Sequence, residues 1–217
     1  MKISNTFLRV ITGAGIFAVL ALAYLLEVTL PGLHAMRWLS VLAVAGGIVE
    51  LVMCLQKTSV ENFQKNAIPF IVFLGWLVFM LDTAYVVGGF PWLMLWLLMI
   101  VIGADIGGWF FGMIFGGDKM WENVSAHKTW SGQIGGIVCG TLMSVLYCKI
   151  AGTNVANAIW VGISVSLLSQ YGDLTASFIK RRLQIKDFSN LLPGHGGILD
   201  RIDGWIYVLP LVWFVLK

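Results

Sequence analysis

The chain has 217 residues, of which 59% are hydrophobic and 12% are charged, and its mean hydropathy is +0.87. Soluble domains carry about 25% charged residues, so a water-soluble fold of this size could not cover so much apolar surface. The formal net charge of +3 is too small to indicate a nucleic-acid partner. Composition therefore excludes an ordinary soluble domain and predicts a protein whose partner is the lipid bilayer.

Apolar runs of about 20 residues predict transmembrane helices. Such runs follow one another at roughly 10–30, 38–56, 67–87, 91–115, 133–151, 155–173 and 204–216, the last being short. The first run is too long for a typical signal-peptide core, and further spans follow it. We predict one integral membrane domain over 1–217, an all-α polytopic bundle with about seven spans and a cytoplasm-facing polar cavity. Residues 1–90 would supply N-terminal helices, and residues 91–217 the catalytic helices and cytoplasmic loops.

The placement of Lys and Arg predicts the orientation of these spans. A cytoplasmic N-terminus, with Lys2 and Arg9 inside, leaves Arg37, Lys149 and Lys217 outside, so that 11 of the 14 basic residues are cytoplasmic. The two most polar segments, 116–132 and 174–203, then also face the cytoplasm, where nucleotides are found. We expect a bacterial inner (cytoplasmic) membrane.

Residues 177–203 combine a cation cluster, a glycine-rich turn and spaced carboxylates. Three consecutive cations occupy 180–182, residues 193–197 read Pro-Gly-His-Gly-Gly, and acids follow at 200 and 203. Taken singly, the cations are typical of a positive-inside flank or a lipid head-group contact, and a lone histidine is typical of a structural hydrogen bond. The combination favours nucleotidyl transfer, because carboxylates bind Mg²⁺ while cations and glycine amides accommodate phosphate charge.

This stretch resembles the signature of the CDP-diglyceride synthase (phosphatidate cytidylyltransferase) family, S-x-x-K-R-x-x-x-x-K-D-x-x-x-x-x-P-G-H-G-G-x-x-D-R-x-D. Its thirteen defined positions are matched in register by Ser177, Lys180, Arg181, Lys186, Asp187, Pro193, Gly194, His195, Gly196, Gly197, Asp200, Arg201 and Asp203. One departure is Ser189, where the family commonly has Gly.

Residues 105–136 resemble a second block of the family, an acid at a helix end followed by aromatic-Gly positions and a loop similar to S-P-K-K-T-x-E-G. The matching residues are Asp105, Gly112, Phe115, Gly116, Lys119, Ser125, Lys128, Thr129, Gly132 and Gly136. Ala126, His127 and Ser131 stand where Pro, Lys and Glu are usual. The resemblance covers about 100–205, and the N-terminal half matches in character only, through an Arg9-Val10-Ile11-Thr12 opening. The chain is short for the family, which predicts that one or two peripheral N-terminal helices are missing.

The resemblance implies that CTP and phosphatidic acid are the substrates and that CDP-diacylglycerol and pyrophosphate are the products. It implies Mg²⁺ as cofactor, with room for a second cation, held by Asp173 and Asp200 and, as further candidates, by Asp105 and Asp203. The implied catalytic residues are Lys180, Arg181, Lys186, Asp187, His195 and Arg201. The implied substrate-binding residues are Ser125, Lys128, Thr129, Ser177, Gly194, Gly196 and Gly197. A homodimer is also implied.

Two further patterns leave alternatives open. Glu50 lies deep in a predicted span, which favours a hydrogen-bonding or packing role over the lining of a cavity. Glycines recur four residues apart at 108, 112 and 116 and again at 132, 136 and 140, a spacing that serves helix packing within the chain or in a dimer.

Other functions compete with the one implied. The same chemistry on another lipid phosphate or a polyprenol, or a CTP-dependent lipid kinase, would use similar loops. A small transporter or channel would instead spread acids through the depth of the bilayer, whereas here the densest cluster is cytoplasmic.

Overall fold

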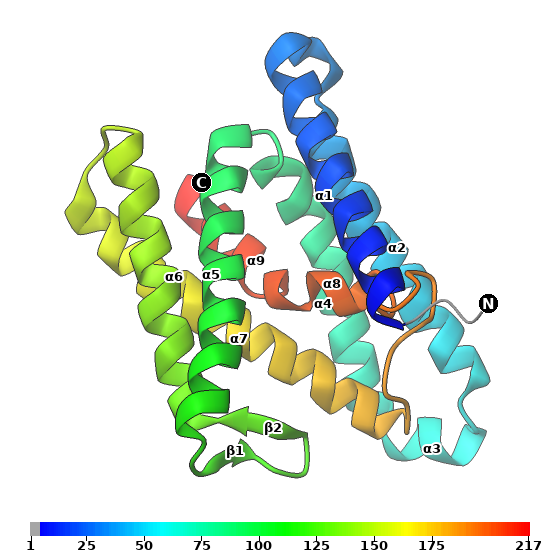
Figure 1. Ribbon diagram of the computed structural model, residues 1–217. Helices are drawn as coiled ribbons and strands as arrows, with labels where there is room; N and C mark the ends of the chain where they lie inside the picture. The colour runs from blue at the N-terminus through cyan, green and yellow to red at the C-terminus, as the bar shows by residue number, and fades with distance from the viewer. Residues whose placement is uncertain (1–4) are drawn as a thin grey trace. The chain divides into compact units, whose positions relative to one another are not determined.

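The computed structural model describes residues 5–217, without the side chains of residues 5–7, Pro31 and Ala126. Lys2, one of the predicted cytoplasmic cations, and the side chain of Ala126 lie outside the described residues. Helices dominate the described chain (Figure 1). In order, the elements are α1 (Asn5–Thr29), η1 (Pro31–Leu33), α2 (Ala35–Lys57), α3 (Val60–Lys65), α4 (Ala67–Val87), α5 (Pro91–Phe115), β1 (Lys119–Trp121), β2 (Ser125–Thr129), α6 (Trp130–Ile150), α7 (Val155–Arg182), α8 (Leu199–Ile202), η2 (Asp203–Trp205) and α9 (Val208–Leu216).

Five helices among the described residues are long and apolar enough to cross a membrane. They are Leu8–Thr29 within α1, and α2, α4, α5 and α6. They match the first five predicted spans to within a few residues and make the chain an integral membrane protein. The predicted count of seven is not confirmed. At 1.5 Å per residue, the nine-residue α9 is about 14 Å long, against a hydrocarbon core of about 30 Å.

The helix α7 runs further than its apolar pattern predicted. Its expected end was near Asp173, but it continues to Arg182. Lys and Arg are good helix formers, and cations in a last turn interact favourably with the helix dipole. The three cations at 180–182 therefore lie within the helix, and Asp173 lies in its interior.

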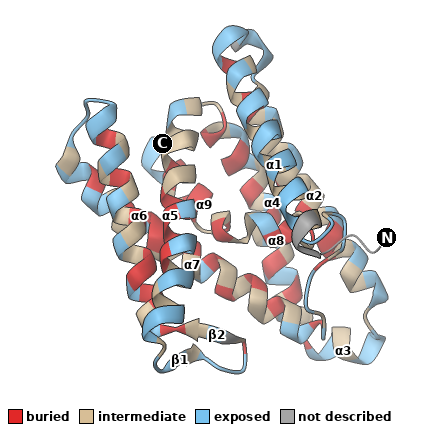
Figure 2. Ribbon diagram, in the orientation of Figure 1, coloured by how far each residue is buried: buried red, intermediate tan, exposed pale blue. Residues whose placement is uncertain are grey.

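The described chain forms two compact units, of which the first comprises the described residues up to Pro91, together with Ile179–Asp203 and Val212–Lys217. In this unit α2 contacts α1, α4 and α8. Its core contains fully buried apolar side chains, which include Leu51, Phe70, Leu77 and Met80. Figure 2 shows buried positions along α4, whereas α1 is largely exposed. The exposed faces of these apolar helices are suited to lipid.

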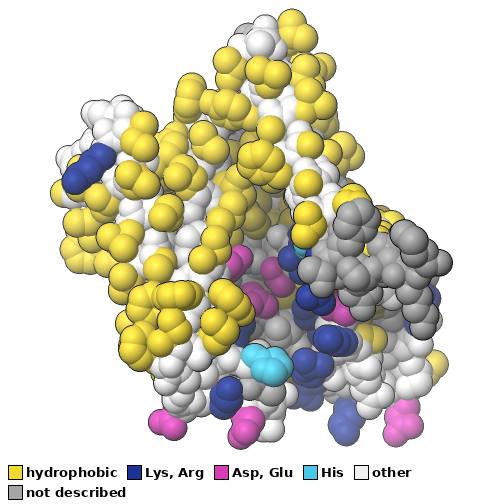
Figure 3. All heavy atoms as spheres, viewed as in Figure 1, with side chains coloured by type: hydrophobic (Ala, Val, Ile, Leu, Met, Phe, Trp, Pro, Cys, Tyr) yellow, Lys and Arg dark blue, Asp and Glu magenta, His cyan; other side chains and the backbone are white. Residues whose placement is uncertain are grey.

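The second unit comprises Trp92–Phe178 and Gly204–Leu211, and its helices α5 and α6 pack closely through glycines. A Cβ atom added at Gly132 would lie 2.7 Å from the carbonyl oxygen of Gly108, and one at Gly136 would lie 2.8 Å from that of Ala104. The packing role predicted for the glycines of α5 and α6 is confirmed within the chain, whereas Gly116 lies beyond the end of α5 with nothing within 4 Å of an added Cβ. Apolar side chains cover the outside of α5 and α6 (Figure 3).

A two-stranded antiparallel hairpin, β1–β2, occupies most of the segment 116–132, which was predicted as a loop. It is the one pair of β-strands among the described residues, and an isolated β-bridge between Leu192 and Gly196 is a further departure from an all-α structure. Lys119 pairs with Thr129, and Trp121 with Ser125. Thr129 then caps α6, because its side chain accepts a hydrogen bond from Gly132 N at 3.2 Å. The strands, of 3 and 5 residues, are too short to show the alternation of apolar and polar residues by which a strand is predicted from sequence.

Candidate functional site

The signature loop, residues 183–198, connects α7 to α8, and a buried aspartate holds it at two points. Asp200 is 6% exposed, and its Oδ2 accepts hydrogen bonds from the backbone N–H groups of Phe188 and Gly197, each at 2.9 Å. Its Oδ1 accepts a hydrogen bond from Lys180 Nζ at 2.7 Å. A buried carboxylate is stable only with such partners. Asp200 therefore connects Lys180 of α7 to two points of the loop, Phe188 and Gly197.

A second buried carboxylate, Glu50 of α2, holds the same loop. Its Oε1 accepts hydrogen bonds from Ser189 Oγ at 2.6 Å and Ile198 N at 2.9 Å, and its Oε2 accepts one from Leu199 N at 2.9 Å. The hydrogen-bonding role predicted for Glu50 is therefore confirmed. A Cβ atom at Gly197 would lie 2.5 Å from Glu50 Oε2, so a side chain at this position would displace the carboxylate.

The glycine-rich turn of the loop rests on the first helix. Thr12 Oγ1 donates a hydrogen bond to the carbonyl oxygen of Pro193 at 2.9 Å. Gly194 has a φ of 75°, which favours glycine, and a Cβ there would lie 2.9 Å from Arg9 Cγ. A Cβ at Gly13 would lie 3.7 Å from His195 Nε2. Arg9, Thr12 and Gly13 share one face of α1 by their spacing, and this face receives the turn.

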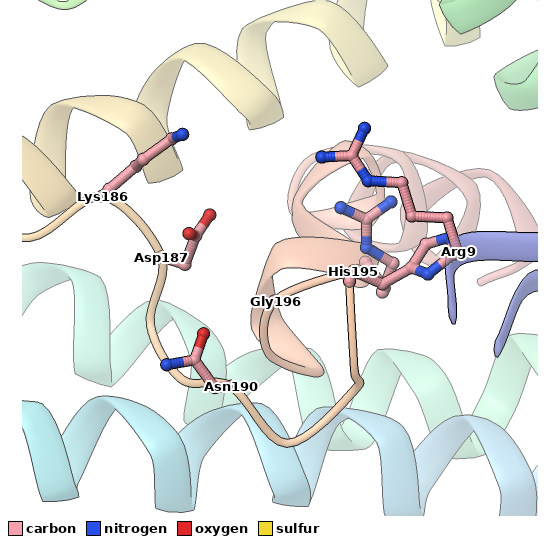
Figure 4. A pocket seen from close by; sticks show the side chains of 8 residues that line it. Arg9, Lys186, Asp187, Asn190, His195 and Gly196 are labelled. Atoms are coloured by element: carbon pink, nitrogen blue, oxygen red, sulfur yellow. The ribbon is translucent and has the colours of Figure 1, made fainter. Parts of the chain in front are cut away.

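A polar pocket of about 500 Å³ lies beside this turn, within the first unit. Its lining consists of Arg9, Lys186, Asp187, Asn190, Gly194, His195, Gly196 and Arg201. Three cations and one carboxylate give it two net positive charges with His195 neutral. Figure 4 shows Lys186, Asp187 and Asn190 along the loop, with His195 next to Arg9 of α1. The pocket is suited to an anion, because its cations outnumber its acid and glycine leaves the backbone accessible.

The second unit carries its own polar cluster, at the hairpin and in α7. Lys128 Nζ lies 2.5 Å from Asp173 Oδ2, and their side chains are 24% and 38% exposed. Ser177 Oγ donates to Asp173 Oδ1 at 3.4 Å, and Lys128 also reaches the carbonyl oxygen of Gln170 at 3.4 Å. Lys128, Asp173 and Ser177, each predicted as a site residue, are thus brought together.

Ser131 replaces the glutamate of the resembled family and has a structural part in this unit. Its hydroxyl hydrogen-bonds with Thr129 Oγ1 at 3.0 Å and donates to the carbonyl oxygen of Gly116. Ser131 therefore links the start of α6 to Gly116, the residue that follows α5, and Thr129 caps the start of α6.

The remaining predicted residues lie at separate places in the two units. Asp105 is exposed in α5, and Ser125 is half-buried in β2 opposite Trp121. Arg181 is exposed in the last turn of α7, and Asp203 is half-buried at the start of η2. Neither Asp105 nor Asp203 lines the pocket beside the glycine-rich turn.

The carboxylates fit a magnesium site in ligand type but differ in access. Mg²⁺ prefers oxygen ligands and usually keeps several waters. Asp173 fits this requirement, since its side chain is partly exposed. Asp200 is buried and already accepts three hydrogen bonds from the protein. Within residues 5–217, no three His, Cys, Asp or Glu side chains gather to hold a metal. The metal roles of Asp173, Asp200, Asp105 and Asp203 stay predictions.

The sequence did not predict that Arg9, Asn190 and Glu50 act at the signature loop, although it predicted a hydrogen-bonding role for Glu50. Arg9 and Asn190 line the pocket, and Glu50 bonds to Ser189. The signal for Arg9 was its place in the Arg9-Val10-Ile11-Thr12 opening, one turn before Gly13. No signal in the sequence pointed to the hydrogen bond between Ser189 and Glu50, because the two residues lie 139 positions apart.

Comparisons with known proteins extend the resemblance to the whole chain. A model of the Cytidylyltransferase family matches residues 2–217. The chain is 32% identical to a phosphatidate cytidylyltransferase of Staphylococcus aureus (strain COL) over 234 residues, covering 94% of this chain and 88% of the relative. It is 38% identical to the phosphatidate cytidylyltransferase of Staphylococcus haemolyticus (strain JCSC1435), covering 56% of this chain and 48% of the relative. It is 35% identical to the phosphatidate cytidylyltransferase of Bacillus subtilis (strain 168), covering 54% of this chain and 45% of the relative. The match of the family model to residues 2–217, together with the coverage of the Staphylococcus aureus relative, shows that the chain belongs to the Cytidylyltransferase family.

Proposed function

We propose that this protein is a phosphatidate cytidylyltransferase, which joins CTP to phosphatidic acid and releases pyrophosphate. The observation that carries the proposal is the signature loop, in which Lys186, His195 and Arg201 line one positively charged pocket. Relatives named phosphatidate cytidylyltransferase, which match up to 94% of the chain, support the same activity.

The reaction needs no nucleophile from the protein. A phosphate oxygen of phosphatidic acid attacks the α-phosphorus of CTP, and the bond between that phosphorus and the bridging oxygen to the β-phosphate breaks. Pyrophosphate leaves with the electron pair, and the new bond yields CDP-diacylglycerol. Catalysis then depends on bringing two anions together in line and on offsetting their charge.

The structure suggests different roles for the cations of the signature. Lys186 and Arg201 line the pocket, so we assign them to contact with phosphate oxygens, with His195 as a further donor. Lys180 is bonded to buried Asp200, and we assign it to holding the loop. Arg181, exposed at the end of α7, keeps its predicted place as a phosphate contact.

Mg²⁺ is part of the proposal, with Asp173 as its accessible ligand and Asp200, Asp105 and Asp203 as the other candidates. When bound, the ion supplies charge neutralisation and orientation for the phosphates of CTP. Lys128 and Ser177 position the Asp173 carboxylate through the contacts described above.

We also propose that the signature loop faces the cytoplasm of a bacterial cell, from its inner membrane. The excess of Lys and Arg in the segments assigned to that side supports this orientation, and CTP is available there. The lipid would enter from the inner leaflet and keep its acyl chains in the hydrocarbon. A homodimer, implied by the family resemblance, is part of the same proposal.

Pyrophosphate release from purified protein in detergent tests the proposal. The assay contains CTP, Mg²⁺ and dioleoyl phosphatidic acid, and each is omitted in turn. Release that needs all three supports the proposed activity. Release with a polyprenyl phosphate but not with phosphatidic acid would move the acceptor to another lipid class. No release from a folded sample with any lipid phosphate would contradict the proposed activity.

A further inference from the structure

We propose that Arg9, in the first turns of α1, binds the phosphate group of the lipid substrate rather than that of the nucleotide. This inference rests on the proposed function and adds to it a residue outside the signature. Arg9 lines the pocket together with Lys186, His195 and Arg201, although these three residues lie near the other end of the sequence.

The side chain of Arg9 is held at the pocket by the packing of the glycine-rich turn on α1. The backbone of Gly194 approaches so closely that an added Cβ would lie 2.9 Å from Arg9 Cγ. The hydrogen bond from Thr12 to Pro193, one helical turn further along, fixes the same face of the helix against the turn. Arg9 therefore belongs to a defined site rather than to a loose flank of positive charge.

The charges of the pocket fit a phosphate monoester. In the part of the chain that the structure describes, Arg9, Lys186 and Arg201 have no salt-bridge partner. Among the same residues, the buried Nδ1 of His195 has no hydrogen-bond partner. The pocket's two net positive charges match the charge of about −1.5 to −2 that a phosphate monoester carries at pH 7. Arginine suits this ligand, since its guanidinium can donate two parallel hydrogen bonds to phosphate oxygens.

The position of Arg9 along α1 favours a lipid over a nucleotide. Arg9 is the second residue of the apolar segment Leu8–Thr29, few of whose residues are buried in the protein. Val10, Ile11 and Phe17, which follow it, are all exposed. A phosphate bound by Arg9 would thus sit where the polar head-group level meets the hydrocarbon, and its acyl chains could lie along α1. CTP has no acyl chain that could contact such an apolar surface.

Steady-state kinetics of the full-length Arg9→Gln variant test this assignment. Loss of one charge-assisted contact should raise the KM for dioleoyl phosphatidic acid by about tenfold to a hundredfold. The KM for CTP should stay within about twofold, because the nucleotide does not use this contact. Arg9→Lys keeps the charge but loses the paired donors. Its KM for dioleoyl phosphatidic acid should therefore fall between those of the wild type and Arg9→Gln. Lys57→Gln removes an exposed cation from α2 in the same unit and is the control, with both KM values unchanged.

A binding measurement separates failure of this inference from failure of the proposed function. Intrinsic tryptophan fluorescence of the wild type and Arg9→Gln is titrated with mixed micelles containing phosphatidic acid, with CTP, and with inorganic phosphate. The inference predicts that the variant binds phosphatidic acid micelles more weakly than the wild type does and binds CTP with unchanged affinity. Weakened CTP binding would reassign Arg9 to the nucleotide. Equal affinities of the wild type and Arg9→Gln for phosphatidic acid micelles would overturn the lipid assignment. So would a variant that binds only inorganic phosphate more weakly than the wild type does. Both results can be read whether or not the wild type releases pyrophosphate.

Discussion

Ser189 donates a hydrogen bond of 2.6 Å to Glu50, so a loop near the C-terminal end is fastened to the second helix. Ser189 occupies a position where glycine is usual in the resembled family. The same carboxylate accepts the N–H groups of Ile198 and Leu199, where α8 begins. The geometry of the signature loop is thus set partly by an acid outside the signature.

Replacing Glu50 by Gln should loosen this loop. The amide keeps one acceptor oxygen for three donors and turns an NH₂ group toward backbone N–H groups. We expect a loss of about 1–3 kcal/mol in the free energy of unfolding, together with a fall in turnover. Thermal unfolding in detergent and pyrophosphate release measure the two effects. Ser189→Gly removes one donor and restores the usual family residue, so it should retain most activity. Unchanged stability of Glu50→Gln would contradict the anchoring role.

Replacing Gly197 by Ala should disturb the same contact from the loop side. The new methyl group would meet Glu50 Oε2 at 2.5 Å, which forces the carboxylate or the loop to move. We expect a destabilisation of about 1–3 kcal/mol, typical of overpacking, and a large loss of turnover. Gly15→Ala is the matched control, because nothing lies within 4 Å of a Cβ at that exposed helical position. If both variants behaved like the wild type, the close contact would not exist in the protein.

Replacing Asp200 by Asn should abolish turnover while leaving membrane insertion intact. The carboxylate is buried, and its ion pair with Lys180 would be broken, which costs about 3–5 kcal/mol when one partner is removed. Membrane fractionation checks insertion, and pyrophosphate release checks activity. Normal turnover of this variant would remove Asp200 from both its structural and its predicted metal role.

Replacing Asp173 by Asn should raise the Mg²⁺ concentration that gives half-maximal turnover. Asp173 is the accessible carboxylate of its cluster, so loss of its charge should weaken the metal by about tenfold or more. A Mg²⁺ titration after removal of metal with a chelator measures this shift. Asp82→Asn, an exposed acid in α4, is the control and should titrate like the wild type. An unshifted midpoint for Asp173→Asn would exclude it as a metal ligand.

The sequence was sufficient for the features that depend on local pattern. Five spans follow from runs of apolar residues, and the glycine spacing in α5 and α6 predicts their close packing. The signature in register predicts the group formed by Lys186, His195 and Arg201, because a short loop keeps its residues near one another.

The sequence did not predict which distant residues come into contact, including the partner of Glu50, whose hydrogen-bonding role alone was predicted. The roles of Arg9 and Glu50 arise from contacts with a loop more than a hundred positions away, and a single acid or cation in an apolar run does not name its partner. The apolar pattern does not predict the extension of α7 past Asp173, because the last turns of the helix are polar and end in cations, which suit the C-terminal turn of a helix. The hairpin at Lys119–Thr129 was missed because its strands are too short for alternation to be recognised.

The fate of labelled CTP tests the central claim most directly. Purified protein is incubated with Mg²⁺, phosphatidic acid and CTP that is labelled at either the α- or the γ-phosphorus, and the lipid is then extracted. Cytidylyl transfer predicts that the α-label enters the lipid as CDP-diacylglycerol and that the γ-label is recovered in pyrophosphate. Transfer of the γ-label to the lipid would contradict the account and indicate a CTP-dependent lipid kinase.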